Sequence, residues 1–84
     1  MKQLRIEHIG SVEVVEIQSS QSIERIMWSH TKRQMMIKFK NSPVYVYPSA
    51  PYSLFKEFVS AESKGRFFLT NVKKQHPQFV RLDN

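Results

Sequence analysis

The stretch PVYVYPSAPYSLFKEF, residues 43–58, carries the last strand pattern and the first helix pattern of the chain. Tyr45 and Tyr47 alternate with valines, which is typical of a half-buried strand. Prolines then interrupt the alternation, and an amphipathic segment follows. The stretch therefore predicts that the chain changes from sheet to helix near residue 50.

The helix after this change is predicted from its N-terminus and from its apolar face. Ser49 or Ala50 is expected to be the N-cap, with Pro51 in the first turn, where its missing N–H costs nothing. The apolar residues gather on one arc of the helix and are expected to face the core: Tyr52, Leu54, Phe55, Phe58 and Val59.

A second helix is predicted to begin near Ser63 and to be stopped by Pro77. One of its sides carries mainly apolar residues, among them Phe67, Phe68 and Val72, with Asn71 and Gln75. The other side carries the row Arg66, Thr70 and Lys73, with Lys74 at its flank. This pattern indicates a helix with one packed face and one basic face.

Strand patterns fill the chain before residue 50. They lie at LRIEHI (4–9), VEVVEI (12–17), IERIMW (23–28) and QMMIKF (34–39), and Gly10-Ser11 separates the first two. Strands followed by helices predict an α+β fold: a small antiparallel sheet of about four to five strands in a meander, with two amphipathic helices packed against it. Residues 1–84 are expected to form a single domain, in which residues 1–18 are an N-terminal strand extension.

The hairpin between residues 34 and 48 is compatible with two registers, because Pro43 cannot donate the hydrogen bond that would close a two-residue turn. An even loop pairs Phe39 with Val44 and places both tyrosines beside Lys38 and Lys40, as an aromatic and basic platform. Bases stack on such platforms, with roughly 1–3 kcal/mol for each base.

An odd loop gives the opposite arrangement. It pairs Phe39 with Tyr45 and places the tyrosines in the core, and small cores need large aromatic side chains. Met36 and Val46 would then form an apolar strip on the other face of the sheet, unless the N-terminal strands cover it.

Charge is distributed unevenly along the chain. The formal net charge is +6, but residues 1–24 hold two basic and four acidic residues, whereas residues 25–84 hold eleven basic and three acidic ones. No acidic residue lies between Arg25 and Lys56. Such a distribution indicates a basic face that meets a polyanion.

Composition excludes several classes of protein. The absence of cysteine rules out disulfides and thiolate metal sites and suits a reducing cytoplasm, which is the location we expect. No apolar run is long enough to cross a membrane, and the N-terminus lacks the apolar region of a signal peptide.

No catalytic pattern is present either. His8, His30 and His76 lie far apart without a metal-binding spacing, and no serine stands in a glycine elbow. We therefore expect no enzymatic activity, no cofactor and no metal ion.

Four segments together resemble the KTSC domain family, named for a C-terminal extension of certain lysyl-tRNA synthetases and also found as free-standing bacterial and phage proteins. The segments are SSQSIERIMW, MMIKFKNSPVYVYP with its Y-x-Y core at Tyr45 and Tyr47, AESKGRFF, and HPQFVRL, which cover residues 19–82. Asn41-Ser42-Pro43 stands where the family usually has a glycine-containing turn. The resemblance implies a small α+β fold without known catalytic activity, and the synthetase context suggests RNA.

The residues expected to neutralise phosphates lie mainly in the second helix and after it. They are Lys64, Arg66, Lys73, Lys74 and Arg81, with Lys38 and Lys40 as a second patch. The Y-x-Y tyrosines are expected to be structural.

The sequence thus predicts a small binding module for RNA or another polyanion. The alternative is a protein-interaction or inhibitor module, of the kind that phages encode, which docks on an acidic protein surface.

Overall fold

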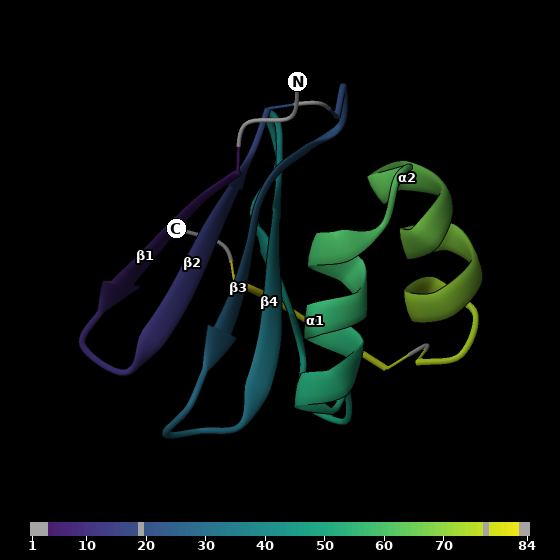
Figure 1. Ribbon diagram of the computed structural model, residues 1–84. Helices are drawn as coiled ribbons and strands as arrows, with labels where there is room; N and C mark the ends of the chain where they lie inside the picture. Colours follow the sequence, from purple (N-terminus) through teal and green to yellow (C-terminus); the bar gives the residue numbers. More distant parts are fainter. Residues whose placement is uncertain (1–3, 19, 77, 83–84) are drawn as a thin grey trace.

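The sheet is built from strands that lie side by side in their chain order. The computed structural model describes residues 4–18, 20–76 and 78–82, and for residues 4–9 it describes the backbone alone. The first five strands form an antiparallel meander: β1 (Leu4–Ile9), β2 (Val12–Ile17), β3 (Ile23–Ser29), β4 (Gln34–Phe39) and β5 (Val44–Tyr47). Both helices lie on one side of this sheet, so the predicted α+β fold is confirmed (Figure 1).

A sixth strand, which the sequence analysis does not predict, follows the helices. β6 (Val80–Leu82) pairs antiparallel with β5 and places the end of the described chain beside its middle. Because β6 occupies the outer side of β5, the edges of the sheet are β1 and β6.

The β1–β2 turn shows why Gly10 interrupts the strand pattern. Ile9 pairs with Val12, so Gly10 and Ser11 alone connect the two strands. Gly10 has a φ of +63°, a left-handed conformation that glycine adopts without steric cost.

The β4–β5 hairpin has the odd register. Met35 pairs with Tyr47 and Ile37 with Tyr45, so both tyrosines lie on the face that the helices cover. The tyrosines thus lie on the core face, as the odd loop predicts. The alternative, in which an even loop places them beside Lys38 and Lys40, is not observed. The particular pairing of Phe39 with Tyr45 is wrong, because Tyr45 lies opposite Ile37.

A tighter loop than expected explains this shift in the pairing. The backbone N–H of Ser42 donates to the Phe39 carbonyl oxygen at 3.3 Å, and Asn41 has a φ of +60°. Asparagine tolerates this left-handed conformation better than most residues do. The turn therefore closes before Pro43, and the missing N–H of that proline is not needed.

The core lies between the sheet and α1 (Tyr52–Ser60), which contributes Leu54, Phe55 and Phe58 as the sequence predicts. The sheet contributes mainly apolar side chains from β2 to β5: Val15, Ile17, Ile23, Ile26, Trp28, Met35, Ile37 and Tyr47. Pro51 itself is the N-cap of α1, in an extended conformation, so the expected cap at Ser49 or Ala50 is off by a residue or two. The Pro51 carbonyl accepts the first helical hydrogen bond from Leu54.

The second helix changes its winding within its length. The helix begins near Ser63, as expected; Ser63 is its N-cap, and its hydroxyl accepts a hydrogen bond from the Arg66 amide. A single α-helical turn, α2 (Lys64–Phe67), then continues as a π-helix, η1 (Phe68–Lys73). The π-helix ends before Pro77, which lies outside the described residues.

Candidate nucleic-acid interface

Two of the lysines predicted to bind phosphates are turned towards groups of the protein itself. Lys64 is 3% exposed, and its Nζ donates to the carbonyl oxygen of Ala61 at the end of α1. Its long aliphatic stem is buried while its ammonium binds a helix-end carbonyl. Lys38 donates to the Phe39 carbonyl at 2.7 Å and lies 3.7 Å from Glu24. Lys64 is thus buried and Lys38 half-buried, so neither lies on an open surface as the phosphate-binding prediction expects.

The predicted row of Arg66, Thr70 and Lys73 is also split. A π-helix has i→i+5 hydrogen bonds and more residues per turn than an α-helix, so residues seven apart no longer lie above one another. Arg66 and Thr70 line a shallow hollow of about 280 Å³ together with Glu62. Lys73 is rotated away from them and lines a different hollow, together with Lys40.

This second hollow is here called the aromatic pocket. It has a volume of about 550 Å³ and lies between the β4–β5 turn, the π-helix and the segment before β6. Its lining residues are Gln21, Ser22, Phe39, Lys40, Asn41, Ser42, Tyr45, Tyr47, Phe68, Lys73 and Phe79. Sites for small ligands typically have volumes of about 300–1,000 Å³.

Five aromatic rings form a connected cluster in this pocket. Phe39 contacts Tyr45 and Phe68 edge to face, with centroid distances of 5.4 and 5.0 Å. Phe79 lies tilted over Tyr45 at 5.1 Å and over Tyr47 at 5.7 Å. Tyr47 is 2% exposed, whereas Phe79 is 47% exposed, so the cluster extends from the core to the surface.

The rim of the pocket is polar and positively charged. Lys40 and Lys73 are exposed, and Lys40 donates one hydrogen bond to the Ser20 carbonyl at 3.0 Å. Hydroxyl and amide groups of Ser22, Asn41 and Ser42 complete the rim. Within the ranges that the structure describes, no carboxylate lines this pocket. The site thus combines aromatic surface with positive charge.

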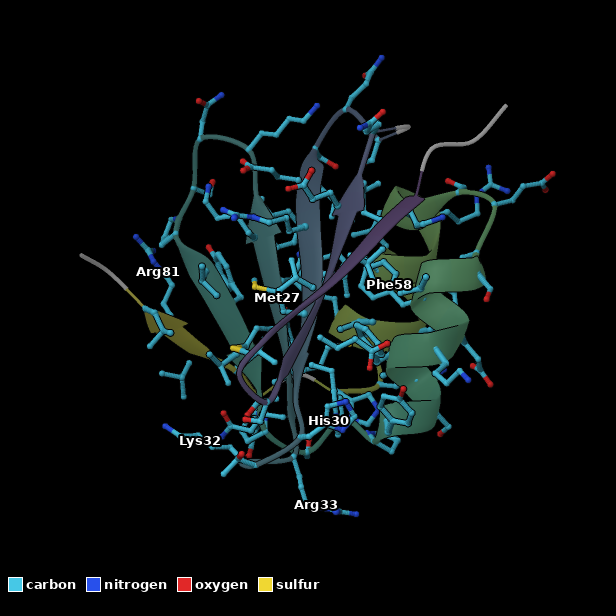
Figure 2. The ribbon with its side chains drawn as sticks, turned by 60° about the vertical axis from the view of Figure 1, so that its left-hand side comes forward. Met27, His30, Lys32, Arg33, Phe58 and Arg81 are labelled. Carbon is cyan, nitrogen blue, oxygen red and sulfur yellow. The ribbon has the colours of Figure 1, made fainter. Side chains whose placement is uncertain are left out.

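Two further predicted residues lie next to the pocket. Arg81 of β6 pairs with Tyr45 of β5, which places both residues on the same face of the sheet. Figure 2 shows Arg81 at the outer edge of the sheet, at the left of the view. Lys74 follows Lys73 and is exposed. Lys40, Lys73, Lys74 and Arg81 therefore define the basic surface around the pocket.

Burial determines the ionisation of the inner tyrosine. It raises the pKa of Tyr47 to about 12, and the neighbouring Tyr45 adds to the shift. Desolvation disfavours the phenolate because a charged group loses its hydration in the core. Tyr47 therefore presents a neutral hydroxyl throughout the physiological pH range.

Sequence reasoning missed the parts that Phe68 and Phe79 play in the pocket. The sequence pattern places Phe68 on the packed helix face, and Phe79 stands in the family segment HPQFVRL without a predicted role. The segment from Phe79 to Leu82 gives only a weak strand signal, because it is short. Phe79 and Arg81 are two residues apart, so they would share a face in an extended chain.

The face of the sheet away from the helices carries a second, more apolar hollow. It has a volume of about 370 Å³ and is lined by Val12, Ser29, Lys32, Gln34, Met36, Val46, Pro48, Val80 and Leu82. The predicted strip of Met36 and Val46 lies here, and Val46 is buried. Val80 and Leu82 of β6 remain about half exposed beside it.

Titratable groups also meet near the start of α1. The same Glu13 carboxylate oxygen lies 3.1 Å from His30 Nε2 and accepts a hydrogen bond from the Tyr52 hydroxyl at 3.1 Å. Desolvation raises the pKa of Tyr52, as do the hydrogen bond and the charge of Glu13. These contacts tie β2 and the end of β3 to α1, and we assign them a structural role.

Two kinds of feature, a metal-binding cluster and a membrane-spanning helix, are not found among the described residues. No group of three histidine, aspartate or glutamate side chains stands close enough together to hold a metal ion. Among the helices in the described ranges, none has the length and apolar character needed to cross a membrane.

Comparison with known proteins identifies the family. The chain is similar in structure to a KTSC domain protein from Yersinia pestis, with a TM-score of 0.71 and 25% sequence identity, over 96% of this chain and 100% of the other. No curated protein matches the chain. The KTSC domain itself matches residues 19–76, well over half of the sequence. The six-stranded protein described above therefore belongs to the KTSC domain family.

Proposed function

We propose that the protein is a non-enzymatic module that binds RNA or another nucleic acid through the basic surface around the aromatic pocket. The observation that carries the proposal is the position of Lys40 and Lys73 beside a cluster of aromatic rings, with no carboxylate among the described lining residues. Cationic side chains bind phosphates, and aromatic rings bind unpaired bases. We further propose a cytoplasmic location, where RNA is abundant.

Electrostatic binding of this kind must depend steeply on salt. Each phosphate that is neutralised on a single strand contributes about −0.7 to the slope of log K against log salt. If Lys40, Lys73, Lys74 and Arg81 each neutralise one phosphate, we expect a slope of about −3. Fluorescence anisotropy with labelled single-stranded RNA, tRNA and duplex DNA across a salt series measures it. No binding to any of the three at about 50 mM salt would refute the proposal.

A matched pair of lysine variants locates the surface. Lys73→Gln removes a charge at the pocket and should reduce the salt slope by about 0.7. Lys32→Gln is the control, because Lys32 is exposed in the β3–β4 turn, beyond the other end of β4 from Lys40, about 20 Å away. Both variants have the same net charge, so a general electrostatic effect would lower the affinity equally. Equal loss in both would contradict binding at the pocket.

The exposed side chains Val80 and Leu82 favour a second candidate, a protein-interaction module that docks on an acidic partner. In that case the apolar hollow beside Lys32 would form the centre of the interface. Leu82→Ser should then abolish co-purification of the partner, while Lys73→Gln should leave it unchanged.

A further inference from the structure

The aromatic pocket has rings within reach of a ligand, which an electrostatic surface alone does not require. Phe79 is 47% exposed, and it overlies Tyr45 and Tyr47 at the mouth of the pocket. Tyr45 and Phe68 are only partly buried beside it. A planar ligand at this place would therefore meet exposed aromatic faces and edges.

The polar groups of the rim add hydrogen-bonding capacity at the same place. Ser22 and Ser42 each offer a hydroxyl, and Asn41 offers an amide with both donors and acceptors. Such groups suit the polar edge of a nucleobase, whose faces are apolar. Lys40 and Lys73 stand at the rim, where phosphates on either side of a bound base would lie.

The charge and depth of the pocket narrow the class of ligand. Two lysines without a lining carboxylate disfavour a cationic ligand and favour an anionic one. A base within a duplex is stacked and paired, so it cannot enter a recessed pocket without being extruded. An unpaired base on a phosphate backbone is free to enter the pocket and carries the negative charge that the lysines favour.

We infer that the aromatic pocket takes one unpaired base of single-stranded RNA, stacked against Phe79 and Tyr45, with the adjoining phosphates on Lys40 and Lys73. This inference rests on the proposed function. It adds that the protein prefers single strands to duplexes, and that the pocket is the place where this preference arises.

Variants of Phe79 test the stacking. Phe79→Leu keeps an apolar side chain but removes the ring, and it should weaken binding of an eight-nucleotide oligouridylate about 5- to 100-fold. Phe79→Tyr keeps the ring and should bind like the unchanged protein. Leu69→Ala is the control, because Leu69 is an exposed apolar residue on the π-helix that does not line the pocket. A thermal melt of each variant confirms that it is folded.

The salt dependence separates this inference from the proposed function. Loss of stacking should lower the affinity at every salt concentration and leave the slope unchanged, whereas loss of a phosphate contact reduces the slope. RNA binding that Phe79→Leu does not weaken, or equal affinity for a duplex of the same length, would overturn the inference and leave the proposed function standing. Absence of all binding at low salt would refute both.

Small ligands identify which part of the RNA occupies the pocket. Uridine 5′-monophosphate should shift the NMR signals of Asn41, Phe79 and Lys73, whereas ribose 5-phosphate, which lacks the base, should shift those of Lys73 alone. Equal shifts by both compounds would show an anion site without base recognition and would overturn the inference. A monophosphate that binds as tightly as the oligouridylate would assign the pocket to free nucleotides and overturn the assignment to a strand.

Discussion

At the scale of single residues, Tyr47 belongs to both the core and the pocket. Its ring is almost completely buried, yet it contacts Phe79, which reaches the surface. The alternation of tyrosine and valine in β5 directs Tyr45 and Tyr47 to the same face. Tyr47 is therefore packed in the core, while Tyr45 lies in the more exposed part of the aromatic cluster.

The raised pKa of Tyr47 predicts a loss of stability at alkaline pH. The pKa is about 12 in the folded protein and about 10 in the unfolded chain, so between these values the folded state holds the proton more tightly. The free energy of unfolding should therefore be unaffected below pH 10 and fall above it, by at most about 2–3 kcal/mol at pH 12.

The variant Tyr47→Phe isolates this contribution. Urea unfolding from pH 8 to pH 11.5, followed by tryptophan fluorescence, should show a smaller alkaline decline in Tyr47→Phe than in the unchanged protein. The same decline in both would show that Tyr47 titrates normally.

Phe58 holds α1 in the core and joins it to the second helix. It is fully buried and stacks on Phe67 with a centroid distance of 5.2 Å, which joins α1 to α2. Phe58→Ala should lower the free energy of unfolding by about 3–5 kcal/mol. Phe58→Leu should cost less, because it leaves a smaller cavity. A cost below about 1 kcal/mol for the alanine variant in urea unfolding would contradict this packing.

At the scale of elements, two glycines provide a test of backbone conformation. An added Cβ would meet nothing within 4 Å at Gly10 or at Gly65, so contacts do not decide either substitution. Gly10→Ala forces a side chain into the left-handed region and should destabilise by about 1–2 kcal/mol. Gly65→Ala lies in α2 and should stabilise by about 0.4–1 kcal/mol. Thermal unfolding of both variants should give midpoints that move in opposite directions.

The elements that the sequence predicts well are those with a strong local pattern. The strands up to Tyr47 follow alternation and β-branched residues, and α1 follows its apolar arc from Leu54 to Phe58. The change from α- to π-helix near Phe68 has no such pattern, because the adjacent Phe67 and Phe68 are compatible with either winding. The three residues of β6 are too short for alternation to stand out from the loop before them.

The candidate site was predicted only in part, because it depends on these weakly specified elements. Lys40 and Lys73 were expected in separate patches, and the π-helix together with the turn at Asn41 brings them to one pocket. The burial of Lys64 is a tertiary effect, since a lysine at a helix start is usually exposed. The face on which Tyr45 and Tyr47 lie depends on the number of residues in the β4–β5 loop. The sequence is compatible with both an even and an odd number, so it does not decide the face.

At the scale of the whole molecule, β6 completes the sheet and carries part of the basic surface. It covers the outer side of β5 and places Arg81 beside Tyr45. Exposed sheet edges are sites at which proteins associate, and a three-residue edge strand offers few free backbone groups.

Truncation tests the role of β6 in the fold. A chain that ends at Gln78 loses Phe79 and β6, so β5 becomes an edge strand. We expect lower stability in urea unfolding, weaker RNA binding and concentration-dependent self-association in analytical ultracentrifugation. The control is a chain that ends at Leu82, which keeps the strand. Equal behaviour of the two truncated chains would show that β6 contributes nothing to stability or solubility.

The pairing of Val44 with Leu82 has a kinetic consequence, because it joins residues separated by nearly half of the chain. The other strand pairs are hairpins between neighbours in the sequence, and local contacts form before distant ones. We therefore expect the pocket to be assembled late in folding, when β6 pairs with β5 and Phe79 reaches the tyrosines. If the pocket binds a ligand as proposed, we expect this binding to be the last property that a newly made chain acquires, and release of β6 from β5 would remove it without unfolding the other strands.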